Sequence, residues 1–223
     1  MEYVIEGGDL PVLRFRLNAG ESLISEAGGR TWSKGPLETE AVSNGGIGKV
    51  LGRAFSGESL LLSRYTAHGD CEIGFTSSFP GEILPIELGP GEQILAQKTA
   101  FLCGTEGIDL EIAFQRRIGA GFFGGEGFIL QKITGPGTVF LEIDGYCLKE
   151  ELSAGEEIVM DTGVLAAMDS SCDMDIRTVK GLKNVLFGRE GLFDTVVRGP
   201  GRVYMQSMPI SKLANLFYNP NSK

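Results

Sequence analysis

Residues 123–137 read FGGEGFILQKITGPG, and this stretch decides the fold because it occurs three times in the chain. It appears 68 residues earlier as FSGESLLLSRYTAHG at 55–69, and 64 residues later as FGREGLFDTVVRGPG at 187–201. The three stretches align without gaps. Self-similarity at a nearly constant spacing is the signature of a protein built from copies of one structural unit. The sequence therefore predicts three tandem copies of a unit of about 65 residues.

Two further elements recur in the same order around this stretch. One is a turn-like segment that ends in Gly-Glu, namely LNAGE at 17–21, LGPGE at 88–92 and LSAGE at 152–156. The other is a segment with alternating acidic residues, namely LETEA at 37–41, IDLEI at 108–112 and CDMDI at 172–176. We place the copies at residues 9–78, 79–142 and 143–208, within a single domain at 1–208. A tail at 209–223 follows.

Each copy reads as short β-strands. Val12 to Leu17 alternates apolar residues with arginines, as in a half-buried strand. Leu60–Leu62 and Phe128–Leu130 are continuous apolar runs, which are typical of strands covered on both faces. The 33 glycines mark tight turns, and the Gly-Pro-Gly segments at 135–137 and 199–201 suggest hairpin connections.

The prediction is an all-β protein with three β-sandwich repeats that share one core. The copies should have one strand order and be related by a pseudo-threefold rotation, because repeats that bury a common core are related by a repeated operation. Little helix is expected. One or two turns are possible at Ile47–Ala54, and the tail should hold a short helix capped by Ser211, with Leu213, Leu216 and Phe217 packing on the core.

Charge and cysteine content exclude several classes of function. The net charge of -9 and the pI near 4.8 repel phosphate backbones, so nucleic acid is not an expected partner. The chain has neither a signal-like start nor an apolar run long enough to span a bilayer, so we expect a cytoplasmic protein and leave membrane association open. The four cysteines have no metal-ligand spacing and are expected to be reduced, buried thiols: Cys71, Cys103, Cys147 and Cys172.

No catalytic motif can be assembled from the remaining candidates. The GxGxxG run at 119–124, followed by Glu142, lacks the long helix that a dinucleotide site needs, and the glycine-rich run at 45–49 lacks P-loop spacing. The only histidine, His68, aligns with Pro136 and Pro200 and is expected in a turn. We therefore predict no catalytic, cofactor-binding or metal-binding residues and no enzymatic activity.

Carboxylates recur at three positions of the copies. Those at Glu58, Glu126 and Glu190 lie beside turn glycines and are expected to accept backbone N–H bonds. A second set is Glu21, Glu92 and Glu156. The third set consists of pairs on strands, which either hold a hard cation or form solvated strand faces with basic neighbours. Few lysines or arginines lie near these pairs in the pattern, so we expect three separate, solvated patches: Glu38 with Glu40, Asp109 with Glu111, and Asp173 with Asp175.

The Ser56-Gly57-Glu58-Ser59 segment, the Gly-Glu-Gly and Gly-Pro-Gly returns, and the order of the copies resemble the mitochondrial-biogenesis family named for altered inheritance of mitochondria, its twenty-fourth member. The resemblance covers nearly the whole chain and includes bacterial and archaeal relatives. It implies a fold like that of the tryptophan RNA-binding attenuation proteins (TRAP-like), a β-sandwich relative of the double-stranded β-helix. It implies no catalytic residues. In the mitochondrial member it implies a role in organising inner-membrane complexes, and the negative charge argues against RNA binding here.

Two hypotheses about function follow. The leading one is a non-enzymatic structural or interaction protein, an assembly or scaffold protein that binds protein partners or forms homo-oligomers. The alternative is a small-molecule-binding or carboxylate-dependent module in a jelly-roll-like fold.

Overall fold

The computed structural model describes residues 1–43, 61–116, 127–178 and 193–210. Within these ranges nearly every element is a β-strand, and the only helical elements in them with bounds are two short 3-10 turns, η1 (Lys98–Ala100) and η3 (Thr162–Val164). The all-β prediction is confirmed. The turns expected at Ile47–Ala54 and the helix expected in the tail lie outside the described residues.

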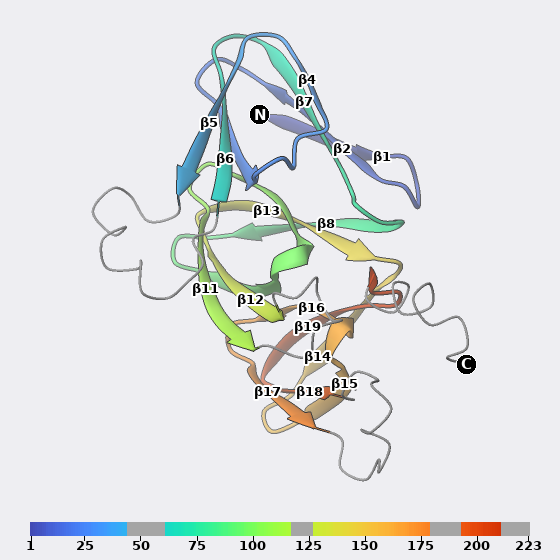
Figure 1. The fold of residues 1–223 in the computed structure, drawn as a ribbon. Helices are drawn as coiled ribbons and strands as arrows, with labels where there is room; N and C mark the ends of the chain where they lie inside the picture. The colour runs from blue at the N-terminus through green and yellow to red at the C-terminus, as the bar shows by residue number, and fades with distance from the viewer. Residues whose placement is uncertain (44–60, 117–126, 179–192, 211–223) are drawn as a thin grey trace. The chain divides into compact units, whose positions relative to one another are not determined.

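The strands form four sheets, and Figure 1 labels many of these strands. The first contains, in spatial order, β1 (Glu2–Glu6), β2 (Val12–Leu17), β7 (Cys71–Thr76) and β4 (Trp32–Lys34). The second contains β5 (Leu37–Ser43), β6 (Leu61–Ala67), β3 (Ser22–Glu26), β10 (Phe101–Thr105), β13 (Gly137–Asp144) and β8 (Gly81–Leu88). The strand predicted at Val12 to Leu17 is confirmed as β2.

The third sheet contains, in order, β11 (Asp109–Arg116), β12 (Phe128–Thr134), β9 (Gln93–Gln97), β16 (Leu165–Asp169), β19 (Gly201–Gln206) and β14 (Cys147–Leu152). The fourth contains β15 (Glu157–Asp161), β18 (Phe193–Arg198) and β17 (Asp173–Thr178). Contacts divide the chain into two compact units. The first comprises Met1–Glu92, Phe101–Glu111 and Ile133–Glu142, and the second comprises Gln93–Ala100, Ile112–Lys132 and Ile143–Lys223.

The order of strand pairing recurs in the three predicted copies. In each copy the first strand pairs with the last, as β2 with β7, β8 with β13 and β14 with β19. The second strand pairs with the fifth, as β3 with β6, β9 with β12 and β15 with β18. A strand of one copy joins a strand of the next at β3–β10 and at β9–β16, with the same register. The superposition of the copies, their pseudo-threefold relation and the single domain at 1–208 stay predictions.

The expected hairpins at the Gly-Pro-Gly segments are wrong. β12 precedes Gly135 and lies in the third sheet, whereas β13 follows it and lies in the second sheet. Likewise, β18 and β19 flank Gly199 and lie in different sheets. Each of these turns is therefore an arch that carries the chain from one sheet to another. Alternation along a sequence indicates strands but not their partners, so the two cases look alike in sequence.

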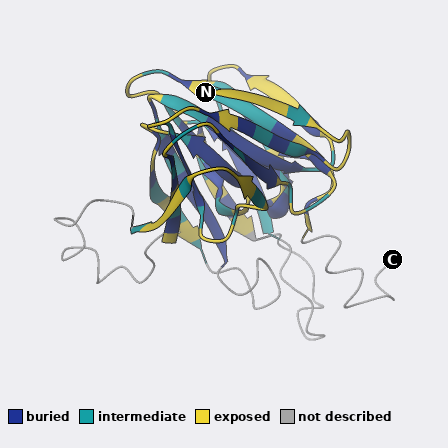
Figure 2. Cartoon of the chain, turned by 90° about the horizontal axis from the view of Figure 1, so that it is seen from above, coloured by how far each residue is buried: buried dark blue, intermediate teal, exposed yellow. Residues whose placement is uncertain are grey.

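Each compact unit has an apolar core. In the first unit it includes Leu13, Phe15, Tyr65, Phe75 and Phe140, and in the second it includes Phe128, Leu130, Leu165, Val197 and Val203. Figure 2 shows buried residues along the strands and exposed residues in the turns. The apolar run at Phe128–Leu130 is buried throughout, as predicted. Leu61, at the start of β6, is instead 66% exposed, because the core covers only the later residues of that strand face.

Candidate functional site

The Gly-Glu segments also carry the chain from one sheet to another, and they form three equivalent arches. The carboxylate of Glu21 accepts a hydrogen bond from the Asn18 N–H at 2.8 Å, that of Glu92 from the Gly89 N–H at 2.8 Å, and that of Glu156 from the Ser153 N–H at 2.9 Å. In return, the backbone N–H of each glutamate donates to the backbone carbonyl of its partner, which is Asn18 for Glu21, Gly89 for Glu92 and Ser153 for Glu156. The preceding glycines have φ values of +88°, +77° and +84°, which favour glycine.

These arches bond to the turns that contain the Gly-Pro-Gly segments. The N–H of Gly135 donates to the carbonyl of Glu92 at 3.0 Å, and the N–H of Gly199 donates to that of Glu156 at 3.0 Å. In the first copy, Ala67 donates to the carbonyl of Glu21 at 3.0 Å. The second set of recurring carboxylates therefore stabilises the fold. The first set, Glu58, Glu126 and Glu190, lies outside the described residues.

Acidification provides a test of the Glu21 arch. The pKa of Glu21 lies below its ordinary value because the Met1 ammonium and then the Asn18 N–H stabilise the carboxylate. A carboxyl whose pKa is lowered in the folded state contributes stability that is fully present above its unfolded pKa of about 4.3. This stability is lost as the pH falls through the folded pKa. We expect Glu21→Gln to lower stability at neutral pH and to flatten the loss of stability below about pH 5, measured by urea unfolding.

A matched control for this test is Glu87→Gln, which removes an exposed carboxylate on β8. This variant should keep the acid limb of the wild-type stability curve. An identical pH dependence in Glu21→Gln and the wild type would contradict a stabilising role for this carboxylate.

Two of the three acidic strand pairs, Glu38 with Glu40 and Asp173 with Asp175, lie beside basic side chains. Glu38 contacts the Nε2 atom of His68 at 2.7 Å, and Glu40 lies opposite Arg64 in the β5–β6 pairing. His68 lies in the turn between β6 and β7, as predicted. Asp109 is exposed and Glu111 is half-buried.

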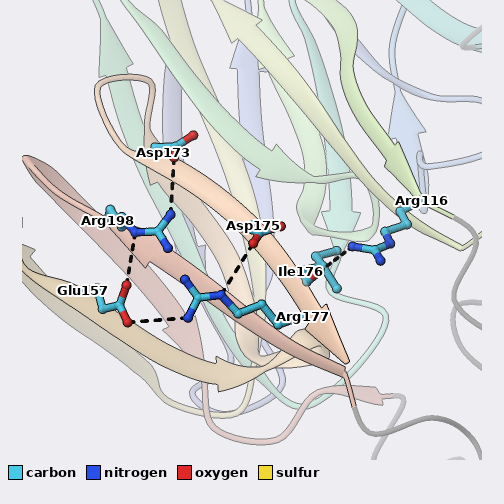
Figure 3. A network of polar contacts seen from close by, with 7 residues as sticks. All are labelled: Arg116, Glu157, Asp173, Asp175, Ile176, Arg177 and Arg198. Atoms are coloured by element: carbon cyan, nitrogen blue, oxygen red, sulfur yellow. Dashed lines mark hydrogen bonds and ion pairs between the residues drawn. The ribbon is translucent and has the colours of Figure 1, made fainter. Parts of the chain in front are cut away.

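The third pair, Asp173 with Asp175, belongs to a network of charged side chains shown in Figure 3. Arg198 contacts Asp173 at 3.5 Å and Glu157 at 3.1 Å. Arg177 contacts Asp175 at 3.5 Å and Glu157 at 3.7 Å. The expectation that few basic residues lie near the pairs is wrong here, because the β17–β18 register brings Arg198 opposite Asp173 from 25 residues away in the sequence. Solvated strand faces with basic neighbours describe the pair best.

Divalent cations offer a direct test of the acidic pairs. Within the described part of the chain, no group of three or more His, Cys, Asp or Glu side chains is arranged to hold a metal ion. We expect millimolar calcium or magnesium to leave the melting temperature unchanged apart from general screening. A saturable rise in melting temperature that Asp109→Asn together with Glu111→Gln abolishes would contradict this expectation.

Two buried polar side chains hold the chain where one predicted copy leads into the next. Glu142 on β13 accepts hydrogen bonds from the Ser78 N–H at 2.6 Å and the Ser77 hydroxyl at 3.0 Å. Gln206 on β19 occupies the corresponding position and accepts one from the Asp144 N–H at 3.1 Å. The acid that follows the GxGxxG run thus has a structural role. The run itself lies outside the described residues, and the element after it is the strand β12.

The cysteines are free and buried, as predicted. Burial raises the pKa values of the Cys71, Cys103 and Cys172 thiols, so these groups are poor nucleophiles at neutral pH.

The first compact unit has a surface hollow of about 700 Å³. Two cationic side chains, Arg16 and Lys34, line it together with three acids, Glu2, Asp70 and Glu72. Arg16 contacts Glu72 at 3.4 Å, so part of this charge is already paired. The hollow suits a small polar molecule better than an apolar one.

The first strands of the three copies differ at their outer edges. β1 pairs along β2 from Glu6 opposite Val12 to Glu2 opposite Arg16, and so covers that edge. β8 ends its sheet and carries Pro85, which removes a backbone donor from the edge. β14 ends the third sheet and has no proline, and within the described residues no strand covers it. Sequence reasoning missed this edge.

The alignment of the copies carried a signal for an exposed face of β14, though not for its open edge. Counting back from the Gly-Glu segments, Glu150 occupies the position of Phe15 in the first copy and Ile86 in the second. Phe15 is fully buried, whereas Glu150 is exposed. A charged residue in a core position of the last copy indicates a surface that no following copy covers.

Comparison with known proteins gives the family. The family described as mitochondrial biogenesis AIM24 matches residues 3–208 of this chain. The chain belongs to the AIM24 family. An uncharacterised protein from Streptococcus pyogenes serotype M6 is 28% identical to this AIM24 chain over 224 residues, which cover 95% of this chain and 88% of that protein. The predicted family resemblance is confirmed.

A crystal structure with this fold is known for a protein from Streptococcus pyogenes. A Streptococcus pyogenes protein solved by a structural genomics consortium matches with a TM-score of 0.76 and 23% identity. The match covers 98% of this AIM24 chain and 99% of the other protein. Among the described residues, no helix is long and apolar enough to cross a membrane.

Proposed function

We propose that this AIM24-family protein is a non-enzymatic structural or interaction protein that works by assembling with protein partners, copies of itself included. The observation that carries the proposal is the open edge of β14. An uncovered strand edge offers backbone donors and acceptors to another chain. Exposed Tyr146 and Leu148, at 65% and 43%, add apolar area beside it.

The chemistry of the described residues supports a non-enzymatic role. The recurring glutamates at 21, 92 and 156 are bound to backbone N–H groups, and the third acidic pair is bound to arginines. The described thiols with raised pKa values are poor nucleophiles. The net charge of -9 disfavours nucleic acid as the partner, and the free thiols suit a reducing compartment such as the cytoplasm.

Native mass spectrometry and light scattering on the full chain, with a pull-down from cell extract, test this proposal. We expect either a defined oligomer or a stoichiometric complex with a protein partner. A chain that stays monomeric across the concentration range and retains no protein would overturn it.

A second candidate is a small-molecule-binding module, and the hollow beside Arg16 and Lys34 favours it. A thermal-shift screen of polar metabolites tests it. Selective stabilisation by several degrees that Arg16→Ala with Lys34→Ala removes would support this function, and stabilisation that the variant retains would place binding elsewhere.

A further inference from the structure

β14 presents a row of charged side chains at its open edge. Its burial pattern places Leu148, Lys149, Glu150 and Glu151 at the surface between buried Cys147 and Leu152. One edge of the strand is occupied by β19 over all six residues, from Cys147 opposite Gln206 to Leu152 opposite Gly201. The other edge ends the sheet as the structure describes it.

β1 shows how the corresponding edge is filled in the first copy. It lies antiparallel to β2 over five residues, and Tyr3 packs against Phe15 with ring centroids 6.0 Å apart. A first strand of this architecture therefore accepts an antiparallel strand on its outer side. A second copy of the chain can supply such a strand from its own β14.

Symmetry limits how two copies of β14 can pair. Two identical antiparallel strands in one sheet are related by a twofold axis perpendicular to that sheet, so facing residues must share a face. Side chains alternate between faces, and Leu148, Glu150 and Leu152 therefore share one face while Lys149 and Glu151 share the other. The allowed registers differ in the residue that lies on the axis.

Charge selects one of these registers. With Glu150 on the axis, Lys149 of each protomer faces Glu151 of its partner, which gives two opposite-charge pairs. In this register Leu148 faces Leu152. With Lys149 on the axis, two lysines face each other. With Glu151 on the axis, two glutamates face each other and Lys149 faces Ser153. The Glu150-centred register is the one that matches opposite charges, at the cost of one Glu150–Glu150 contact.

We propose that two copies of this chain associate through β14, antiparallel and centred on Glu150, with Lys149 of each copy opposite Glu151 of the other. The third sheet of one protomer then continues into the third sheet of its partner. This inference rests on the proposed assembly function and names its partner as a second copy. A contact made by one six-residue strand of each protomer lies at the low end of the size range of specific interfaces. We therefore expect the dimer to form at micromolar or higher concentration.

Charge exchange tests the register, with the dimer dissociation constant of the full chain measured by light scattering and analytical ultracentrifugation. Lys149→Glu and Glu151→Lys should each weaken the dimer by about tenfold or more, because both attractive pairs become repulsive. Mixing the two variants should restore dimerisation, since each facing pair in the mixed dimer then joins a glutamate of one variant to a lysine of the other. Glu150→Gln should strengthen the dimer by removing the like-charge contact on the axis.

The control is Glu106→Lys, which changes the net charge as Glu151→Lys does but lies in an exposed turn between β10 and β11. It should leave the dissociation constant unchanged, and circular dichroism should show that all variants are folded. A wild-type dimer that Lys149→Glu does not weaken would overturn this interface while leaving the assembly function standing. A wild-type chain that is monomeric but retains another protein in the pull-down would also overturn it. A monomer that retains nothing would overturn both proposals.

Discussion

Replacing Phe15 with alanine is expected to lower the free energy of unfolding by about 3–5 kcal/mol. Phe15 is fully buried, and its ring meets those of Phe75 and Phe140 edge to face, with centroids 6.0 Å and 5.1 Å apart. Alanine would remove these two ring contacts and the contact with Tyr3, and would leave a cavity in the first compact unit. Urea unfolding followed by circular dichroism measures the loss.

Phe15→Leu is the matched control, because it keeps an apolar side chain and removes only the ring. It should cost clearly less than the alanine variant. A loss below about 1 kcal/mol for Phe15→Ala would show that this aromatic cluster does not organise the core. Phe140 belongs to β13 of the second predicted copy, so the experiment also measures how far that strand stabilises β2 of the first.

The second large effect is expected at Glu142. Its carboxylate accepts hydrogen bonds from the Ser77 hydroxyl and from the Ser78 N–H and hydroxyl, and the side chain is only 9% exposed. Glu142→Ala leaves the Ser78 N–H without this acceptor, so a loss of about 1.5–3 kcal/mol is expected. Thermal and urea unfolding would measure it.

Glutamine is the informative comparison at this position. Gln206 fills the corresponding position in the third copy and accepts the Asp144 N–H through its side-chain oxygen. Glu142→Gln should therefore retain most of the stability, since an amide oxygen can accept the Ser78 N–H. Equal losses for Glu142→Ala and Glu142→Gln would show that the negative charge, rather than the accepted hydrogen bond, is what this position requires.

The fold class was predictable because its signals are local. Alternating residues from Val12 to Leu17 and the glycines of the Gly-Glu segments report strands and turns directly. The partner of each strand is a long-range property. The chain around Gly135 has the composition of a hairpin, yet the two flanking strands do not pair with each other: β12 pairs with β11 and β9, and β13 pairs with β10 and β8.

The candidate sites were less predictable for the same reason. The carboxylate of Asp173 looked unpartnered because Arg198 reaches it only through the β17–β18 register. The binding of Glu92 to the Gly89 N–H depends on a backbone turn whose composition alone does not show which donors are free. By contrast, the exposed face of β14 was readable in principle, since Glu150 replaces the buried Phe15 at a matching position.

The arches also bear on how the chain is made by the ribosome. Because each arch sends the chain into another sheet, β2 has only β1 as a partner until its second partner β7 is made, where Thr76 faces Val12. At a synthesis rate of about 5–20 residues per second, the apolar face of β2 waits roughly 3 to 13 seconds for that partner to emerge. Non-local pairing of this kind folds slowly. Newly made chains should therefore be substrates of ribosome-associated chaperones, and slowed translation between residues 17 and 71 should increase aggregation.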